Sequence, residues 1–129
     1  MTLESPKTHS SKSQEEMFNY LSNVDNFKHL MPSSLEKFEK INDTSFLFQL
    51  KGMPEIQLEM KEKDPFHTII LGARSEKLPF TLKANIEESG DGSDVQLLFE
   101  GQFNAMMAMM IKKPIKNFIG ALSENMATV

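Results

Sequence analysis

Few side chains in this sequence are placed to carry out acid–base or nucleophilic chemistry. Catalysis in a ligand pocket needs polar side chains that converge inside an apolar cavity. The polar residues nearest to the expected core are Tyr20, Gln49, Gln57, Arg74, Lys83, Asn85 and Gln102. Most of them alternate with apolar residues along expected strands, so they should point away from the core. We therefore assign no catalytic residue from the sequence.

The sequence also lacks the residue patterns that bind metals or cofactors. The histidines His9, His29 and His67 lack a metal-binding spacing, and no Asp or Glu pattern completes a site around them. The segment Asp91–Asp94 lacks the rest of a calcium-binding loop, so we interpret it as a hairpin turn. The absence of cysteine excludes disulfides and thiolate ligands. The sequence predicts neither a metal site nor a cofactor.

Apolar side chains suited to binding are more abundant. The chain of 129 residues has ten Met and ten Phe, and Met106, Met107, Met109 and Met110 fall within one short segment. Met is unbranched and polarizable and adapts to irregular ligands, while Phe offers large flat surfaces. The same residues also make an ordinary core, so a ligand cavity and a filled core both remain open. Met106 and Met109 project away from the main apolar stripe of their helix, where contact with a second copy would form a homodimer.

The charge distribution argues against nucleic acid as a partner. Residues 104–129 contain three lysines and one glutamate, so the rest of the chain holds −6 against the overall net charge of −4. With Arg74 as its single arginine, this acidic body lacks the basic surface that phosphates require. No apolar run approaches the roughly 20 residues of a membrane-spanning helix, and Met1–Ser13 is too polar for a signal peptide. We expect one cytoplasmic domain, residues 1–129, without a membrane span.

Two short helices are predicted near the start of the chain. A short strand within Thr2–Ser10 precedes a helix that begins at a capping box formed by Ser13 and Glu16. A second helix should span about Asp25–Met31 and end before Pro32.

From Leu35 to Phe103 apolar residues recur with a period of two, which predicts an antiparallel meander of six strands. In the first of these strands Phe38 is out of phase with its apolar neighbours, which indicates a bulge. Turn-forming residues separate the strands at Asn42-Asp43, Gly52-Met53-Pro54, Asp64-Pro65, Lys77-Leu78-Pro79 and Gly90-Asp91-Gly92.

The last segment, Asn104–Ala127, is predicted to form one long helix capped by Asn104. Its apolar stripe consists of Met107, Met110, Ile111, Pro114, Ile115, Phe118, Ile119, Leu122 and Met126. Pro114 lies in the helix interior, where the missing N–H should produce a kink.

This order of elements, together with three short segments, resembles the START-like (SRPBCC) superfamily, which includes the birch-pollen allergen and polyketide cyclases. The segments are Phe18–Phe27, Leu78-Pro79-Phe80 and Met106–Pro114, and the match is to small bacterial members. The resemblance implies an α+β helix-grip fold, in which a curved antiparallel sheet of about seven strands wraps around the long C-terminal helix.

The resemblance also implies a cavity between sheet and helix, because members of the superfamily bind lipids, sterols or polyketides there, and some catalyse cyclisation or dehydration. We expect a non-enzymatic protein that binds a small apolar ligand such as a lipid, an isoprenoid or a polyketide. A cyclase or dehydratase, or an interaction module with a filled core, remain alternatives. The candidate cavity-lining residues are Phe46, Phe48, Leu58, Ile69, Leu71, Phe80, Leu82, Leu97, Phe99, Met107, Met110, Ile111 and Phe118.

Overall fold

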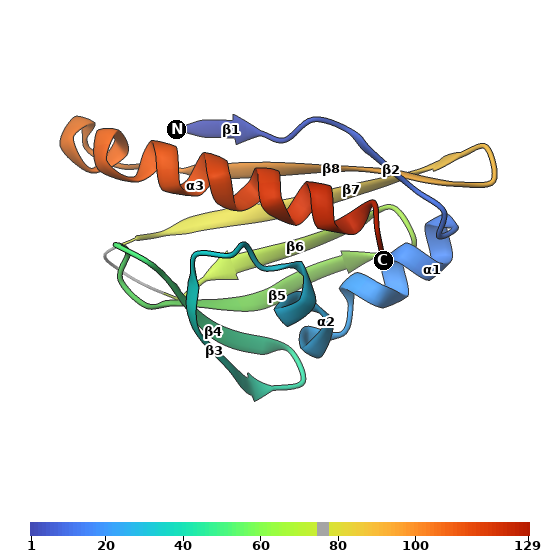
Figure 1. Ribbon diagram of the computed structural model, residues 1–129, viewed down its shortest axis with the longest axis horizontal. Helices are drawn as coiled ribbons and strands as arrows, with labels where there is room; N and C mark the ends of the chain where they lie inside the picture. The colour runs from blue at the N-terminus through green and yellow to red at the C-terminus, as the bar shows by residue number, and fades with distance from the viewer. Residues whose placement is uncertain (75–77) are drawn as a thin grey trace.

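A curved antiparallel sheet packs against one long helix and two short ones in the computed structural model, which describes residues 1–74 and 78–129 (Figure 1). The strands are β1 (Thr2–Glu4), β2 (Thr8–Ser10), β3 (Leu35–Asn42), β4 (Ser45–Leu50), β5 (Ile56–Asp64), β6 (Thr68–Ala73), β7 (Phe80–Ser89) and β8 (Gly92–Gly101). The helices are α1 (Gln14–Leu21), α2 (Val24–Leu30) and α3 (Ala105–Met126). This architecture confirms the predicted α+β helix-grip fold.

The sheet has the strand order β1-β8-β7-β6-β5-β4-β3, and β2 also pairs with β8. The strands from β3 to β8 form the predicted meander, because each pairs with the next along the chain. The N-terminal segment differs from the prediction of a single strand, since β1 and β2 pair separately with the same neighbour. Pro6 lies between them and has no N–H to donate to a ladder, so the segment forms two short strands and the sheet has eight in total.

The local signals for bulges and turns are mostly confirmed. The pairing of β3 with β4 shifts register between Leu35 and Lys37 and again between Lys40 and Asn42, which confirms the irregular first strand. The β7–β8 turn contains Gly90 at a φ of 57°, a conformation that glycine adopts without strain. Of the turn expected at Lys77-Leu78-Pro79, Lys77 lies outside the described residues, and Leu78 is buried.

Helix α1 begins at the predicted capping box. The backbone N–H of Glu16 donates to Ser13 Oγ at 3.1 Å, and the N–H of Ser13 donates to Glu16 Oε1 at 3.0 Å. These bonds hold the pKa of Glu16 below its usual value, because they favour the charged carboxylate. Helix α2 starts at Val24, one residue earlier than predicted, because the side chain of Asn23 caps it.

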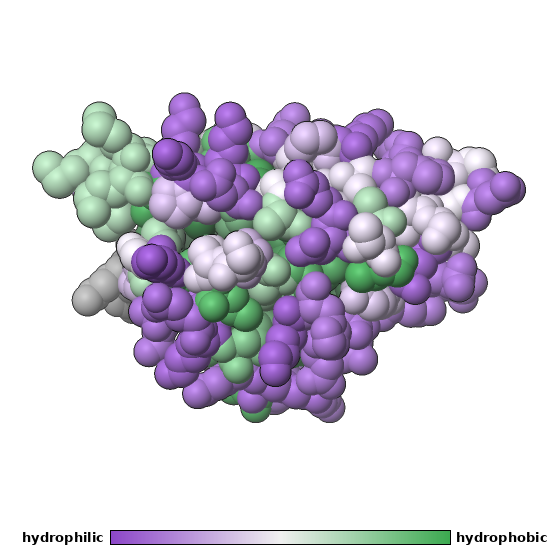
Figure 2. All heavy atoms as spheres, viewed as in Figure 1, coloured by the Kyte–Doolittle hydropathy of each residue, from purple (hydrophilic) through white to green (hydrophobic). Residues whose placement is uncertain are grey.

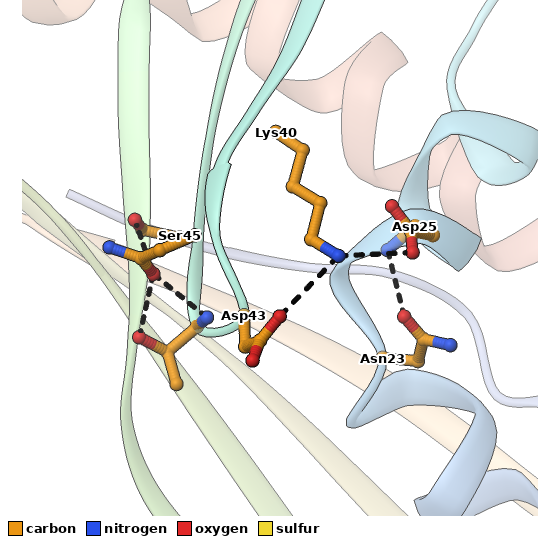
Figure 3. A network of polar contacts seen from close by, with 7 residues as sticks. Asn23, Asp25, Lys40, Asp43 and Ser45 are labelled. Atoms are coloured by element: carbon orange, nitrogen blue, oxygen red, sulfur yellow. Dashed lines mark hydrogen bonds and ion pairs between the residues drawn. The ribbon is translucent and has the colours of Figure 1, made fainter.

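Polar contacts join α2 to the β3–β4 hairpin (Figure 3). Lys40 of β3 reaches between two carboxylates, with Nζ at 3.3 Å from Asp25 and 3.5 Å from Asp43. The hydrogen bond to Asp25 is the main reason that the pKa of Lys40 is raised. In the hairpin itself, Asn42 Oδ1 accepts hydrogen bonds from Thr44 and Ser45. The network lies where α2 meets the β3–β4 edge of the sheet, and Phe27 of the same helix is buried in the core.

Stacked phenylalanines fill the space between the sheet and the helices. Phe118 of α3 stacks on Phe48 with ring centroids 5.1 Å apart. Phe46 stacks on Phe27 of α2 at 5.1 Å, so the aromatic layer runs from α3 through β4 to α2. Pro114 is accommodated inside a helix that continues as one element from Ala105 to Met126. None of the helices in the described part of the chain has the length and apolar character to cross a bilayer.

Candidate functional site

The candidate residues from the sheet and from the middle of α3 meet in the core as expected. Ten of them are buried: Phe46, Phe48, Leu58, Ile69, Leu71, Phe80, Leu82, Leu97, Phe99 and Phe118. A void of about 10 Å³ lies between the sheet and the helices. It is lined by Ile69, Leu71, Leu82 and Leu97, together with Leu21, Phe27, Ala84, Leu122 and Met126. A void of this size has room for about one water molecule, and its apolar lining offers that water no hydrogen bond.

The six remaining core candidates line neither this void nor the pocket described next. Phe46, Phe48, Leu58, Phe80, Phe99 and Phe118 instead pack directly against one another and their neighbours. The rings of Phe80 and Phe99 are tilted against each other with centroids 4.7 Å apart, so they pack in close contact. These side chains therefore stabilise the fold and leave no room for a ligand in their present arrangement.

A larger apolar pocket lies at the N-terminal end of α3 and has a volume of about 290 Å³. Three of the predicted residues line one side of it: Met107, Met110 and Ile111. The opposite side consists of Gly52, Met53, Pro54 and Glu55 from the β4–β5 loop, with Leu78 from the segment before β7. We call this cavity the mouth pocket. Met53 and Leu78 were expected in turns, so their place in a pocket lining was not predicted.

Local hydrogen bonds hold both sides of the mouth pocket in place. Asn104 caps α3, as predicted, because its Oδ1 accepts the N–H of Met107 at 2.8 Å. In the β4–β5 loop, Gly52 has a φ of 81°, and the N–H of Met53 donates to the carbonyl of Leu50 at 3.0 Å. The side chain of Gln49 then donates to the carbonyl of Met53 at 3.1 Å. These contacts turn Met53 inward, so an apolar side chain closes the pocket from the loop.

The first turns of α3 depart from the predicted apolar stripe. Met110 was expected to face the core but is 67% exposed, and Met107 is only half-buried. Burial along the stripe starts at Ile111 and includes every later member except the half-buried Pro114, because the preceding turns extend beyond the end of the sheet and have no strand opposite them (Figure 1). The prediction of a core position for Met110 was therefore wrong, while Met106 and Met109 are exposed, as expected.

Among the described residues, one ionisable side chain lines the mouth pocket. Glu55 is exposed, and its carboxylate lies 3.4 Å from Nζ of Lys37. A single carboxylate with a cation beside it can orient a polar group of a ligand, but it does not form a pair of acid and base. The geometry therefore suits hydrophobic binding better than proton transfer.

A second hollow of about 250 Å³ is polar and lies over β7 and β8. Its lining includes Lys7, His67, Glu87 and Asp94. These groups contact their neighbours: Lys7 pairs with Glu87 at 3.5 Å, and His9 bonds Asp94 at 2.9 Å, which lowers the pKa of Asp94. Within residues 1–74 and 78–129 no three His, Asp or Glu side chains are placed to hold a metal ion.

The polar side chains inside the core are serines with structural partners. Ser5 Oγ accepts the N–H of Leu97 at 2.9 Å, and Ser93 Oγ donates to the carbonyl of Lys12 at 2.9 Å. Ser123 Oγ contacts Thr8 and the carbonyl of Pro6, which ties α3 to the N-terminal segment. In the part of the chain that the structure describes, every buried side-chain nitrogen or oxygen has such a partner. These hydroxyls serve the fold.

No protein-family model and no curated protein matches this sequence. Solved structures do match. Norcoclaurine synthase from Thalictrum flavum is 14% identical with a TM-score of 0.76, covering 99% of this chain and 84% of that protein. TTHA0849 from Thermus thermophilus is 10% identical with a TM-score of 0.77, and the KanY protein is 8% identical with a TM-score of 0.79. Each of the latter two alignments covers 99% of this chain and 95% of the other. The chain has the helix-grip fold of birch-pollen-allergen-like, or SRPBCC, proteins.

Proposed function

We propose that this protein binds a small apolar molecule, or the apolar end of a longer one, in the mouth pocket. The observation that carries the proposal is the contrast between a closed interior of about 10 Å³ and an apolar pocket of about 290 Å³ beside it. Ligand pockets in proteins start at about 300 Å³ and are lined mostly by apolar side chains with a few polar groups. The mouth pocket agrees with the lower end of that range.

The energetics favour a modest affinity. Burying about 300 Å² of apolar ligand surface at roughly 25 cal/mol/Å² contributes about 7 kcal/mol before the cost of association. Most of that contact would come from four apolar side chains of the lining: Met53, Leu78, Met107 and Ile111. Met side chains change rotamer easily, so the pocket can adjust to ligands of different outline.

The fold comparison is compatible with a small-molecule function. Norcoclaurine synthase of Thalictrum flavum has also been solved in complex with dopamine and hydroxybenzaldehyde, so in that protein the fold accommodates small organic molecules. A cyclase or dehydratase remains the alternative for this chain. It would need a second polar side chain facing Glu55 across the mouth pocket, and the described lining residues include none.

A second candidate function is an interaction module, which the closed interior favours. In that case the exposed Met106 and Met109 would contact a partner, and the mouth pocket would receive part of that partner instead of a free ligand. The two functions differ in whether an isolated small molecule binds to the purified protein.

Titration with an apolar fluorescent probe tests the proposal. The Met107→Trp variant should fill the pocket and weaken probe binding by roughly tenfold or more, because lost volume removes the contact area. Met109→Trp is the matched control, since it makes the same change on the same helix at a residue outside the pocket lining. Equal probe affinity in both variants, or an absence of binding to the unmodified protein, would contradict the proposal.

A further inference from the structure

An apolar tip projects from the end of the molecule at the start of α3. Met106, Met109 and Met110 are 73%, 81% and 67% exposed, and we call these three side chains the methionine tip. Figure 2 shows apolar spheres at this end of α3 standing out from a body whose surface is otherwise mostly hydrophilic. Large apolar side chains that gather on one exposed protrusion indicate a surface that is covered in use.

Lysines follow the methionine tip on the same side of α3. Met106, Met109, Lys113 and Lys116 are spaced by three or four residues, so they lie along one face of the helix. Lys112 adjoins that face, and all three lysines are exposed. No Asp or Glu occurs from Gly101 to Ser123, although the chain has 18 acidic residues. The helix is therefore basic on an acidic protein, a pattern typical of helices that contact anionic membrane surfaces.

The spacing along α3 matches the layers of a bilayer surface. A rise of about 1.5 Å per residue places Lys113 about 10 Å along the axis from Met106. Apolar side chains of interfacial helices penetrate about 5–10 Å, to the boundary between headgroups and acyl chains. If α3 approaches the bilayer with its N-terminal end first and the methionine tip reaches that depth, Lys112, Lys113 and Lys116 lie about 10 Å or more behind Met106, at the level of the lipid phosphates.

The mouth pocket opens at the same end. Met110 belongs both to its lining and to the methionine tip, and Met107 lies between the two. We propose that the methionine tip and the three lysines dock the protein on an anionic lipid bilayer, so that the mouth pocket faces the membrane. The docking step deepens the proposed function, since an apolar ligand then passes between bilayer and pocket without crossing water.

Charge complementarity favours a bilayer over a second copy of this chain. A two-fold contact through the methionine tip would bring Lys112, Lys113 and Lys116 close to the same lysines of the partner, and like charges repel. Phosphates of anionic lipids would neutralise them instead. Among the described residues that line the pocket, the acidic one is Glu55, and its carboxylate has Lys37 Nζ at 3.4 Å, which offsets its repulsion of anionic lipid.

Co-sedimentation with vesicles tests the docking. The protein should bind vesicles that contain about one-third phosphatidylglycerol in phosphatidylcholine and should bind pure phosphatidylcholine much less. Raising the ionic strength from about 0.1 M to about 0.5 M should weaken the binding, because salt screens the lysines. The double variant Lys113→Gln/Lys116→Gln should lose roughly 30-fold in partition coefficient. Its matched control is Lys28→Gln/Lys63→Gln, which removes the same charge from α2 and from the far end of β5 and should bind as the unmodified protein does.

A second pair of variants separates docking from ligand binding. Met106→Ser/Met109→Ser removes two side chains of the methionine tip that lie outside the pocket lining. It should lose vesicle binding roughly tenfold or more, yet keep its affinity for the fluorescent probe in vesicle-free buffer. The docking proposal would be overturned if this variant bound vesicles as well as the unmodified protein, or if the unmodified protein bound neutral and anionic vesicles equally. It would also be overturned if light scattering showed a dimer of the unmodified protein that this variant abolishes. None of these results would alter the probe titration, which tests the pocket alone.

Discussion

The two halves of α3 carry similar apolar side chains in opposite surroundings. From Ile111 onward the stripe is buried except at the half-buried Pro114, and Met126 near the C-terminal end is 1% exposed. Before Ile111 the same residue type is in solvent, with Met109 the most exposed of the group. Pro114 lies close to the boundary between the halves. One half of the helix completes the core, and the other half provides the pocket and the protruding tip.

The length of a helix relative to its sheet decides which part of its apolar face is buried and which part stays in solvent. Ridges of apolar side chains stabilise a fold only where another element lies opposite them. The strands end before the first turns of α3 begin (Figure 1), so the apolar face there is free for other contacts. The first turns of α3 are therefore of functional interest because no strand covers their apolar side chains.

The largest change in the free energy of unfolding should come from shortening a side chain in the buried half of α3. Phe118→Ala removes the ring that stacks on Phe48 and should lower the free energy of unfolding by about 3–5 kcal/mol. Met109→Ala in the exposed half should change it by less than about 0.5 kcal/mol. Urea denaturation of both variants measures the contrast. A cost below about 1 kcal/mol for Phe118→Ala would mean that the core is not centred on this residue.

Restoring a backbone N–H donor at the boundary between the two halves of α3 should raise the free energy of unfolding. Pro114→Ala supplies an N–H that can bond to the carbonyl of Met110, and a mid-helix proline costs up to about 3 kcal/mol relative to alanine. We expect a higher free energy of unfolding and an altered probe affinity, since the first turns of α3 would settle differently over the mouth pocket. Greater stability with unchanged probe affinity would show that Pro114 has no part in shaping the pocket.

Capping contributions should be smaller. Ser13→Ala removes the hydroxyl that accepts the N–H of Glu16 and should cost about 1 kcal/mol. Asn104→Ala at the start of α3 removes a similar bond, but the turns that it caps are exposed and can fray without opening the core. We expect a lower cost for Asn104→Ala in urea denaturation. An equal cost would indicate that both halves of α3 unfold together with the core.

The smallest effect concerns pH. The bonds from Ser13 hold the folded-state pKa of Glu16 below its ordinary value of 4.5. A lowered carboxyl pKa stabilises the folded state at pH values above 4.5, and this contribution is lost as the pH falls through the folded pKa. The difference in unfolding free energy between the unmodified protein and Glu16→Gln should therefore shrink as the solution is acidified below that value. A difference that stays constant with pH would contradict this role for Glu16.

Most of the fold follows from local patterns in the sequence. Three local patterns each specify an element within a few residues: the alternation of Ile56 and Leu58 with polar neighbours, the capping box at Ser13 and the apolar stripe of α3. The split of the first strand into β1 and β2 was not predicted, because both parts depend on pairing with β8 at the other end of the chain.

The candidate site was only partly predictable, for a physical reason. Periodicity reports which residues share a face, as for Met107 and Met110, but it does not report whether a strand lies opposite that face. The other side of the mouth pocket depends on Met53 and Leu78, which are distant in sequence from α3. A methionine between a glycine and a proline in a turn was the one available signal, because turn positions rarely need a large apolar side chain.

The ten methionine methyl groups can report whether a ligand binds at the mouth pocket or between the sheet and the helix. Methyl NMR of methionine-labelled protein, titrated with the apolar probe, reports on both regions at once. We predict that the signals of Met53, Met107 and Met110 shift on binding, while those of Met17 and Met126 in the core stay unchanged. Shifts of Met17 and Met126 with Met53 and Met107 unchanged would contradict the account, because the ligand would then occupy the space between sheet and helix.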